Sequence, residues 1–308
     1  MRNLKRALSL ALAAIMLIGM MVVSASATGL DDFSDKDKVV NKDAVSMLVS
    51  LGIIEGKPDG SYGPTENVDR AQMAKMLSVI MNKGVDNSAL YQSVNSGLVD
   101  VNTNWAKGHI NYCYTTGIIA GRGNGKFDPD AGVTGSEAAK MLLVALGYDP
   151  AIEQYVGNDW AVNVAADAVD AGIAVSGVIM ADAMTREQAA QMAYQTLEAD
   201  MVRYASRGTT IQQPDGSTII VGNTAAEPVS KTDSDYAGDS NDDTQQFCER
   251  YFADLKKVNG EDDFARPASQ WKLKNDIIGT YLAEADGTFT TAVDKGDLYD
   301  VIGRTVYN

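Results

Sequence analysis

The sequence predicts a mainly α fold: three helix-loop-helix repeats in a pseudo-threefold bundle, followed by a hairpin, a linker and a small α/β C-terminal unit. The main observation is that the stretch 64–77 returns at 129–142 with the same spacing and similar chemistry, and that a shorter copy occupies 184–192. Repetition at a period of about 50–65 residues indicates one supersecondary unit used several times. Because one helix pair cannot bury its apolar face alone, three units are expected to pack into one domain.

Residues 1–27 are predicted to be a secretory signal peptide. Arg2, Lys5 and Arg6 precede an apolar run at 7–23, and the small residues at 25–27 suit a signal peptidase. The alternative is an uncleaved membrane anchor, for which the run is short. We therefore expect an exported chain with no stable membrane insertion after cleavage.

The charge of the chain excludes several classes of partner. Its formal net charge is −15, and loss of the three N-terminal cations would give −18, since no acidic residue precedes Asp31. Such a chain repels phosphate backbones and anionic lipid, so no nucleic-acid partner is expected. The two cysteines, Cys113 and Cys248, are far apart in the sequence and are expected to be unpaired.

The first helix of each repeat is expected to end at a glycine. Apolar residues recur at helical spacing over about 42–51, and Gly52 follows them. Gly117 and Gly172 hold the same place in the second and third repeats. A glycine just past a helix adopts the left-handed conformation readily, and the apolar residue after it, here Ile53, folds back onto the last turn.

The second helix of each repeat is expected to start with a reciprocal capping box. The pairs are Asp69 with Gln72, Thr134 with Glu137, and Thr185 with Gln188. Between the two helices, the loops of the first two repeats contain tight-turn pairs followed by an aromatic residue. Tyr62 and Phe127 are expected to insert these loops into the core.

The chain changes character after residue 203. A hairpin is predicted around the turn at 214–216, followed by a linker rich in small polar residues at 223–244. An amphipathic helix carrying Phe247 and Leu255 then leads into a short apolar region. The predicted units are 1–27, the repeats 30–85, 95–148 and 150–202, the hairpin and linker 203–245, and a small C-terminal unit at 246–308, whose core is expected to be incomplete without further chain or a partner.

Several motifs, in order, resemble the S-layer homology domain, a surface-anchoring module usually found in threes. The aromatic-x-Asp opening is at 33–35, and the Trp-Ala pairs begin at Trp105 and Trp160. The Gly-Ile-Ile-x-Gly stop is at 52–56 and 117–121, and the glycine-aromatic-proline loop ends at 64 and 129. The resemblance covers about residues 30–200, with a third repeat that has lost the loop.

The resemblance implies a noncovalent anchor that holds a secreted or S-layer protein at a Gram-positive-type cell wall. Its expected partner is an anionic secondary cell-wall polysaccharide attached to peptidoglycan, in many members pyruvylated. The helix-start arginine of the family, matched by Arg70 and Arg186, is implied to bind the anionic sugar. A guanidinium beside free N–H groups at a helix N-terminus suits a carboxylate. Gly135 replaces this arginine in the second repeat, so at most two competent grooves are expected.

The remaining candidate polysaccharide-binding residues are the helix starts, the stop glycines and the tryptophans: Asp69, Thr134, Thr185, Gly52, Gly117, Gly172, Trp105 and Trp160. Both tryptophans are expected to anchor their helices in the core, with stacking on a sugar as the alternative. His109 is the only histidine and is expected to be a surface residue. No catalytic residue, metal or cofactor is predicted.

Two other functions compete with the anchor. One is a surface-anchored enzyme acting on wall or extracellular polysaccharide through the region after 203. Ser269 and Lys272 fit a Ser-x-x-Lys motif there, but the companion motifs of penicillin-interacting enzymes are absent from the sequence, so the chain is expected not to be an enzyme. The other is a structural protein that associates with itself in a surface layer, which an acidic exported chain allows.

Overall fold

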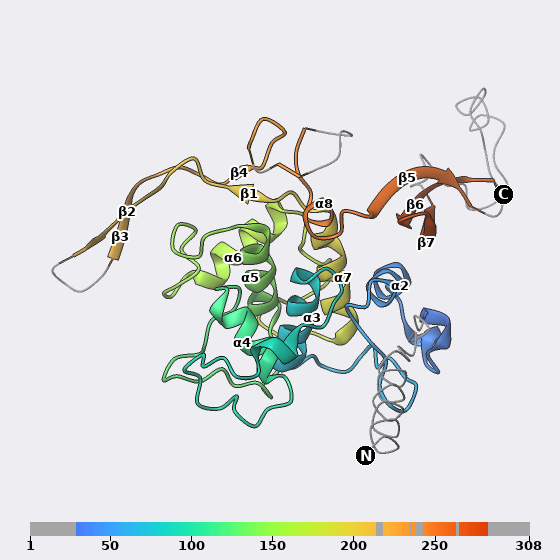
Figure 1. Ribbon diagram of the computed structural model, residues 1–308, viewed down its shortest axis with the longest axis horizontal. Helices are drawn as coiled ribbons and strands as arrows, with labels where there is room; N and C mark the ends of the chain where they lie inside the picture. The colour runs from blue at the N-terminus through green and yellow to red at the C-terminus, as the bar shows by residue number, and fades with distance from the viewer. Residues whose placement is uncertain (1–28, 214–217, 235, 238–242, 263–264, 283–308) are drawn as a thin grey trace, which may run out of the picture.

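The structure is a computed structural model that describes residues 29–213, 218–234, 236–237, 243–262 and 265–282. The predicted signal peptide at 1–27 and the hairpin turn at 214–216 lie outside these residues. Within them, no helix is long and apolar enough to cross a membrane. The bundle and the elements after it can be followed along the chain in Figure 1.

Three helix pairs, followed by the shorter helix α8, make up the helical part of the described residues. The helices are α2 (Lys42–Ser50), α3 (Arg70–Met81), α4 (Lys107–Thr115), α5 (Gly135–Leu146), α6 (Trp160–Asp170), α7 (Arg186–Glu198) and α8 (Phe247–Tyr251). Short 3-10 turns lie at η1 (Leu30–Asp32), η2 (Lys36–Lys38) and η3 (Ser88–Tyr91). Each repeat therefore contributes one helix before its loop and one after it.

The glycine stops form as predicted. Gly52, Gly117 and Gly172 have φ values of 69°, 78° and 72°, which an L side chain rarely adopts. After Gly52, the N–H of Ile53 donates to the carbonyl of Leu48 over 2.8 Å, and Ile53 is buried. This is the hydrogen bond of a Schellman motif, so the glycine ends the helix and returns the chain to the core.

All three predicted capping boxes are present. The Asp69 carboxylate accepts from the N–H of Gln72 over 2.7 Å, and the Gln72 amide oxygen accepts from the N–H of Asp69 over 3.3 Å. The boxes at Thr134 and Thr185 have the same two reciprocal bonds. Each box satisfies donors that a helix start leaves without partners, so α3, α5 and α7 begin at equivalent positions.

Three backbone hydrogen bonds join the repeats in a closed ring just before these helices. The N–H of Val68 donates to Met184, that of Met184 to Val133, and that of Val133 to Val68, each over 2.9 Å. Because every member donates once and accepts once, no repeat can leave without breaking two bonds. The second helices α3, α5 and α7 begin immediately beyond this ring.

The loops are fixed from two sides. Tyr62 and Phe127 are buried as predicted, at 1% and 0% exposure. In the second repeat, the Asp100 carboxylate accepts from the N–H groups of Phe127 and Asp128 over 2.9 and 2.8 Å. Burial acts to raise the pKa of Asp100, but these two N–H groups outweigh it and hold the pKa below its usual value. Asp35 binds the first loop in the same way.

The C-terminal elements are antiparallel strands. β1 (Val202–Arg203) pairs with β4 (Glu227–Pro228), and β2 (Arg207–Gln212) pairs with β3 (Thr218–Asn223). β5 (Leu255–Glu261), β6 (Pro267–Leu273) and β7 (Asp276–Leu282) form a three-stranded sheet in that order. The strands of the predicted hairpin are therefore confirmed, and they extend as an arm away from the helices (Figure 1).

Two expectations for this region differ from the structure. The predicted helix reaching Leu255 is wrong, because α8 ends at Tyr251 and Leu255 starts β5 by pairing with Leu273. The described parts of 223–244 are not a free linker, since Val229 bonds to Met201 and Gln245 bonds to Val229, over 2.8 Å each. Neither the strand pairing of Leu255 nor the backbone bonds of Val229 could be predicted from local composition, because their partners are distant in the sequence.

The sheet packs on the helical core rather than standing apart from it. Trp271 in β6 is 1% exposed and belongs to the same apolar cluster as the helices. Its Nε1–H donates to the hydroxyl of Tyr194 in α7 over 3.2 Å. Cys113 and Cys248 are buried and unpaired, as predicted.

We expect Asp100→Ala to lower the free energy of unfolding by about 2 kcal/mol at neutral pH, since two N–H groups lose a charged acceptor. The pKa of Asp100 is depressed in the folded protein, so its contribution is complete above the unfolded pKa of about 4 and disappears as the pH falls through the folded value. The difference from wild type should therefore shrink in urea titrations below about pH 4. Exposed Asp37→Ala is the control, and an equal loss there would contradict the assignment.

Candidate functional site

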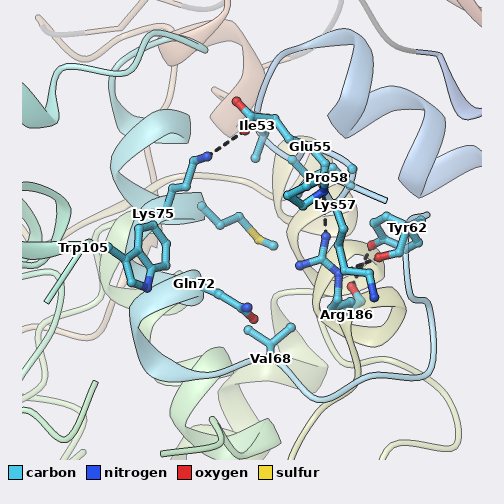
Figure 2. Close-up of a pocket in the computed structure, with 13 residues that line it drawn as sticks. Ile53, Glu55, Lys57, Pro58, Tyr62, Val68, Gln72, Lys75, Trp105 and Arg186 are labelled. Atoms are coloured by element: carbon cyan, nitrogen blue, oxygen red, sulfur yellow. Dashed lines mark hydrogen bonds and ion pairs between the residues drawn. The ribbon is translucent and has the colours of Figure 1, made fainter. Parts of the chain in front are cut away.

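A pocket of about 210 Å³ lies where the third repeat meets the first. Arg186 at the start of α7 and the stop loop of the first repeat lie together on one side of it, opposite Lys75 and Trp105 (Figure 2). Gln72, Lys75 and Met76 of α3 and Trp105 before α4 complete the wall. All three repeats therefore contribute to one site, as expected from a helix start packed on a neighbouring stop loop.

The Arg186 guanidinium is held by carbonyl oxygens rather than by a carboxylate. Its Nε donates to the carbonyl of Tyr62 over 2.8 Å, and its Nη2 donates to that of Glu55 over 3.0 Å. The Tyr62 ring lies under the guanidinium, 5.0 Å from its carbon. Among the described residues no carboxylate forms an ion pair with Arg186, and its side chain is only partly buried. It is therefore a positioned cation with binding capacity left for an external anion.

Two lysines extend the positive side of the pocket. Lys57 forms an ion pair with Glu66 over 2.5 Å, and Lys75 forms one with Glu55 over 2.9 Å. Lys57 also lies 3.9 Å from Asp59, so with Arg186 these six side chains carry three positive and three negative charges and are neutral together, in a chain of net charge −15. The pocket is thus electrostatically distinct from the protein as a whole.

Trp105 is not a core residue, contrary to expectation. It is 56% exposed and lines the pocket, while the neighbouring Ala106 is fully buried. The helix is therefore anchored by the alanine, and the indole face is left at the pocket. Trp160, the equivalent residue of the third repeat, is partly buried against the core.

The helix-start N–H groups are not free, contrary to the expectation for an anion site. The N–H groups of Arg186 and Glu187 donate to the carbonyls of Glu66 and Pro64, over 2.8 and 3.2 Å. Those of Arg70 and Ala71 are used in the same way by the second loop. The chemistry available for an anion therefore comes from side chains.

Arg70 occupies the equivalent junction between the first and second repeats, which we call the Arg70 junction. It is only 2% exposed. Its Nε and Nη2 donate to the carbonyls of Phe127 and Ala120 over 2.8 and 3.0 Å, and its Nη1 forms an ion pair with Glu137 over 2.9 Å. Arg70 is therefore a buried, fully bonded side chain rather than a solvated residue of the first helical turn.

The third junction has no cation, as Gly135 predicts, and it is filled. A Cβ at Gly135 would lie 2.9 Å from the Cα of Met180, so no larger residue fits without movement. The N–H groups of Gly135 and Ser136 donate to Asp182 and Met180 over 3.1 and 2.8 Å. The three equivalent junctions therefore hold different residues: Arg186 without an ion-pair partner among the described residues, Arg70 paired with Glu137, and Gly135 packed against Met180.

The other candidate residues lie at helix ends. Asp69, Thr134 and Thr185 use their side chains as caps, and none of the three lines the pocket. The stop glycines also lie outside the pocket lining, and they are exposed at the ends of the first helices: Gly52, Gly117 and Gly172. Sequence reasoning missed Gln72, Lys57 and Lys75 as pocket residues.

His109 is buried, which corrects the prediction of a surface residue. It is 4% exposed, with Nδ1 2.6 Å from the Ser78 hydroxyl and Nε2 3.7 Å from Asp86. Burial lowers the pKa of His109 below its usual value. The prediction failed because the sequence does not show which face of α4 packs on α3.

A family profile described as the S-layer homology domain matches residues 32–74 and 99–139. The chain contains S-layer homology domains. The α6–α7 pair lies outside the matched residues but closes the same ring of backbone bonds. The matched residues include the stop loops, the Asp35 and Asp100 anchors, and the starts of α3 and α5.

Relatives named as surface-layer, cell surface and cell wall proteins agree with this. The chain is 31% identical over 218 residues to a cell surface protein of Thermoanaerobacter kivui, covering 70% of this chain and 27% of that protein. It is 35% identical over 104 residues to an S-layer protein of Bacillus licheniformis, covering 34% and 11%. It is 29% identical over 92 residues to an uncharacterized cell wall amidase of Bacillus anthracis, covering 30% and 16%. The chain spans about a quarter or less of these relatives, and its location is the bacterial cell surface.

The two junction arginines should differ in their effect on stability. Arg70→Ala removes one member of a buried ion pair and is expected to lower the free energy of unfolding by about 3 kcal/mol. Arg186→Ala removes a partly exposed side chain bound to two carbonyls and should cost about 1 kcal/mol. Urea unfolding followed by circular dichroism measures both. Equal losses would show that the two arginines are equally structural.

Proposed function

We propose that this chain holds a surface protein noncovalently at the cell wall by binding an anionic wall polysaccharide in the Arg186 pocket. The observation that carries the proposal is the Arg186 guanidinium, which is fixed by two carbonyls, faces a pocket and has no ion-pair partner among the described residues. The S-layer homology match and the surface-protein relatives support it.

The chemistry of the pocket favours a sugar that carries a carboxylate. A guanidinium binds a carboxylate through a planar fork, and charge-assisted bonds of this kind are about twice as strong as neutral ones. Lys57 and Lys75 line the same pocket, each paired with a carboxylate that it could exchange for one of the ligand. A polymer with repeated carboxylates would be held in this pocket although the protein as a whole repels anions.

The remaining walls suit the sugar ring. Trp105 presents an exposed indole beside Gln72, and Ile53, Val68 and Met76 supply apolar surface. A pyruvate ketal on a sugar presents a methyl group and a carboxylate from the same carbon. Arg186 has no ion-pair partner among the described residues and lies beside apolar walls, which matches that combination, so we propose a pyruvylated wall polymer attached to peptidoglycan as the partner.

The pseudo-threefold bundle is part of the same proposal. The closed ring of Val68, Met184 and Val133 supports it, because it sets each helix start on the loop of a neighbouring repeat. Self-association in a surface layer and the absence of catalysis after residue 203 stay predictions of the sequence.

The purified chain should sediment with cell-wall sacculi and should stop doing so after hydrofluoric acid removes the wall polymer. Arg186→Ala should weaken binding about 30-fold, since a charge-assisted hydrogen bond contributes about 2 kcal/mol. Arg186→Lys keeps the charge without the fork and should give an intermediate loss. Arg203→Ala, far from the pocket, is the control. Undiminished binding to stripped sacculi would exclude the polymer as the receptor.

A further inference from the structure

The Arg186 pocket and the Arg70 junction are built from equivalent residues. Adding 65 to the loop residues of the first repeat converts Glu55 into Ala120 and Tyr62 into Phe127. Each arginine donates through Nε to the carbonyl of the aromatic residue and through Nη2 to the other carbonyl, with distances equal within 0.1 Å. Each guanidinium also lies over the aromatic ring. The backbone therefore presents both arginines in the same way.

The two sites differ at the third residue of the helix that follows the loop to which the arginine bonds. In the Arg70 junction this residue is Glu137, whose side chain is 16% exposed. Its carboxylate bonds to Arg70 Nη1 over 2.9 Å and to Arg122 Nη2 over 2.7 Å, and it also accepts from the N–H of Thr134 over 3.0 Å. Two guanidinium groups and a backbone donor therefore already surround an internal carboxylate.

In the Arg186 pocket the equivalent residue is Gln72. Its amide oxygen completes the capping box with Asp69, as the Glu137 carboxylate does with Thr134, but it carries no charge. Lys57 takes the place of Arg122 and is paired with Glu66 instead. The position that Glu137 fills with a carboxylate is thus left without an anion beside Arg186.

We infer that this third helix residue determines which site accepts an external anion, so that the Arg70 junction is a latent copy of the Arg186 pocket with Glu137 in the place of the ligand carboxylate. The inference rests on the proposed function of the Arg186 pocket. Glu137 is attached to the same domain, so an external carboxylate competes with a group at very high effective concentration. Of these two arginine sites, the Arg186 pocket is therefore the one that binds the wall polymer.

The other parts of the latent site are retained. Lys140 corresponds to Lys75, and Trp160 corresponds to Trp105. Lys140 Nζ lies 5.4 Å from the Trp160 ring and donates to the carbonyl of Tyr155 over 2.6 Å. Replacing Glu137 with glutamine would leave Arg70, Arg122 and Lys140 without this internal carboxylate, and the amide keeps the capping box as Gln72 does.

The test transfers binding from one site to the other. Arg186→Ala should lose affinity for a methyl hexopyranoside bearing a 4,6-linked pyruvate ketal, measured by isothermal titration calorimetry. Adding Glu137→Gln should restore affinity to within about tenfold of wild type, with parallel recovery in sacculus sedimentation. Glu249→Gln in the Arg186→Ala background makes the same change in the α8 capping box and should restore nothing.

The reverse change covers the case in which the double variant fails to fold, which thermal melting followed by circular dichroism shows. Gln72→Glu in the wild-type chain should reduce affinity at least tenfold, because it places a carboxylate beside Arg186. A folded double variant that recovers no binding, or Gln72→Glu with wild-type affinity, would overturn the inference. Failure of wild type to bind either probe would instead refute the proposed function.

Discussion

The ring of three backbone hydrogen bonds through Val68, Val133 and Met184 is the constraint on which the rest of the structure depends. It fixes the three helix starts relative to one another before any side chain is considered. The capping boxes then set where each helix begins, and the N–H groups of its first turn bond to the loop of a neighbouring repeat. The three junctions therefore share one backbone arrangement, and a few side chains decide whether each holds a cation and how that cation is paired.

Those side chains have diverged while the frame has been kept. One junction holds Arg186 with the neutral Gln72, another holds Arg70 with Glu137, and the third holds Gly135 against Met180. The first keeps an available cation, the second neutralises its cation internally, and the third is filled by backbone and sulfur. A repeat fold thus supports three stable junctions with different side chains, and among the described residues the first of them holds an arginine without an ion-pair partner.

The sequence predicts the parts of this structure that depend on local rules. The capping boxes and the glycine stops follow from residues within five positions of each other, and the burial of Tyr62 and Phe127 follows from their place after a turn. The sequence also singled out Arg186 as a candidate. Together these cover most of the helical frame.

What the sequence could not predict depends on contacts between repeats. The burial of Arg70 requires knowing that Glu137 and the Phe127 carbonyl face it, and the exposure of Trp105 requires knowing that Ala106 anchors the helix instead. His109 was misplaced for the same reason, since its partner Ser78 belongs to another repeat. The strand at Leu255 is likewise fixed by a distant partner, Leu273. In each case the deciding contact joins residues more than 15 positions apart or depends on how helices pack.

The number of binding sites per chain tests the central claim most directly. Isothermal titration calorimetry of the wild-type chain with the methyl hexopyranoside pyruvate ketal should give a stoichiometry of one. Two or more equivalent sites would show that the Arg70 junction opens to ligand despite Glu137, and would contradict the account.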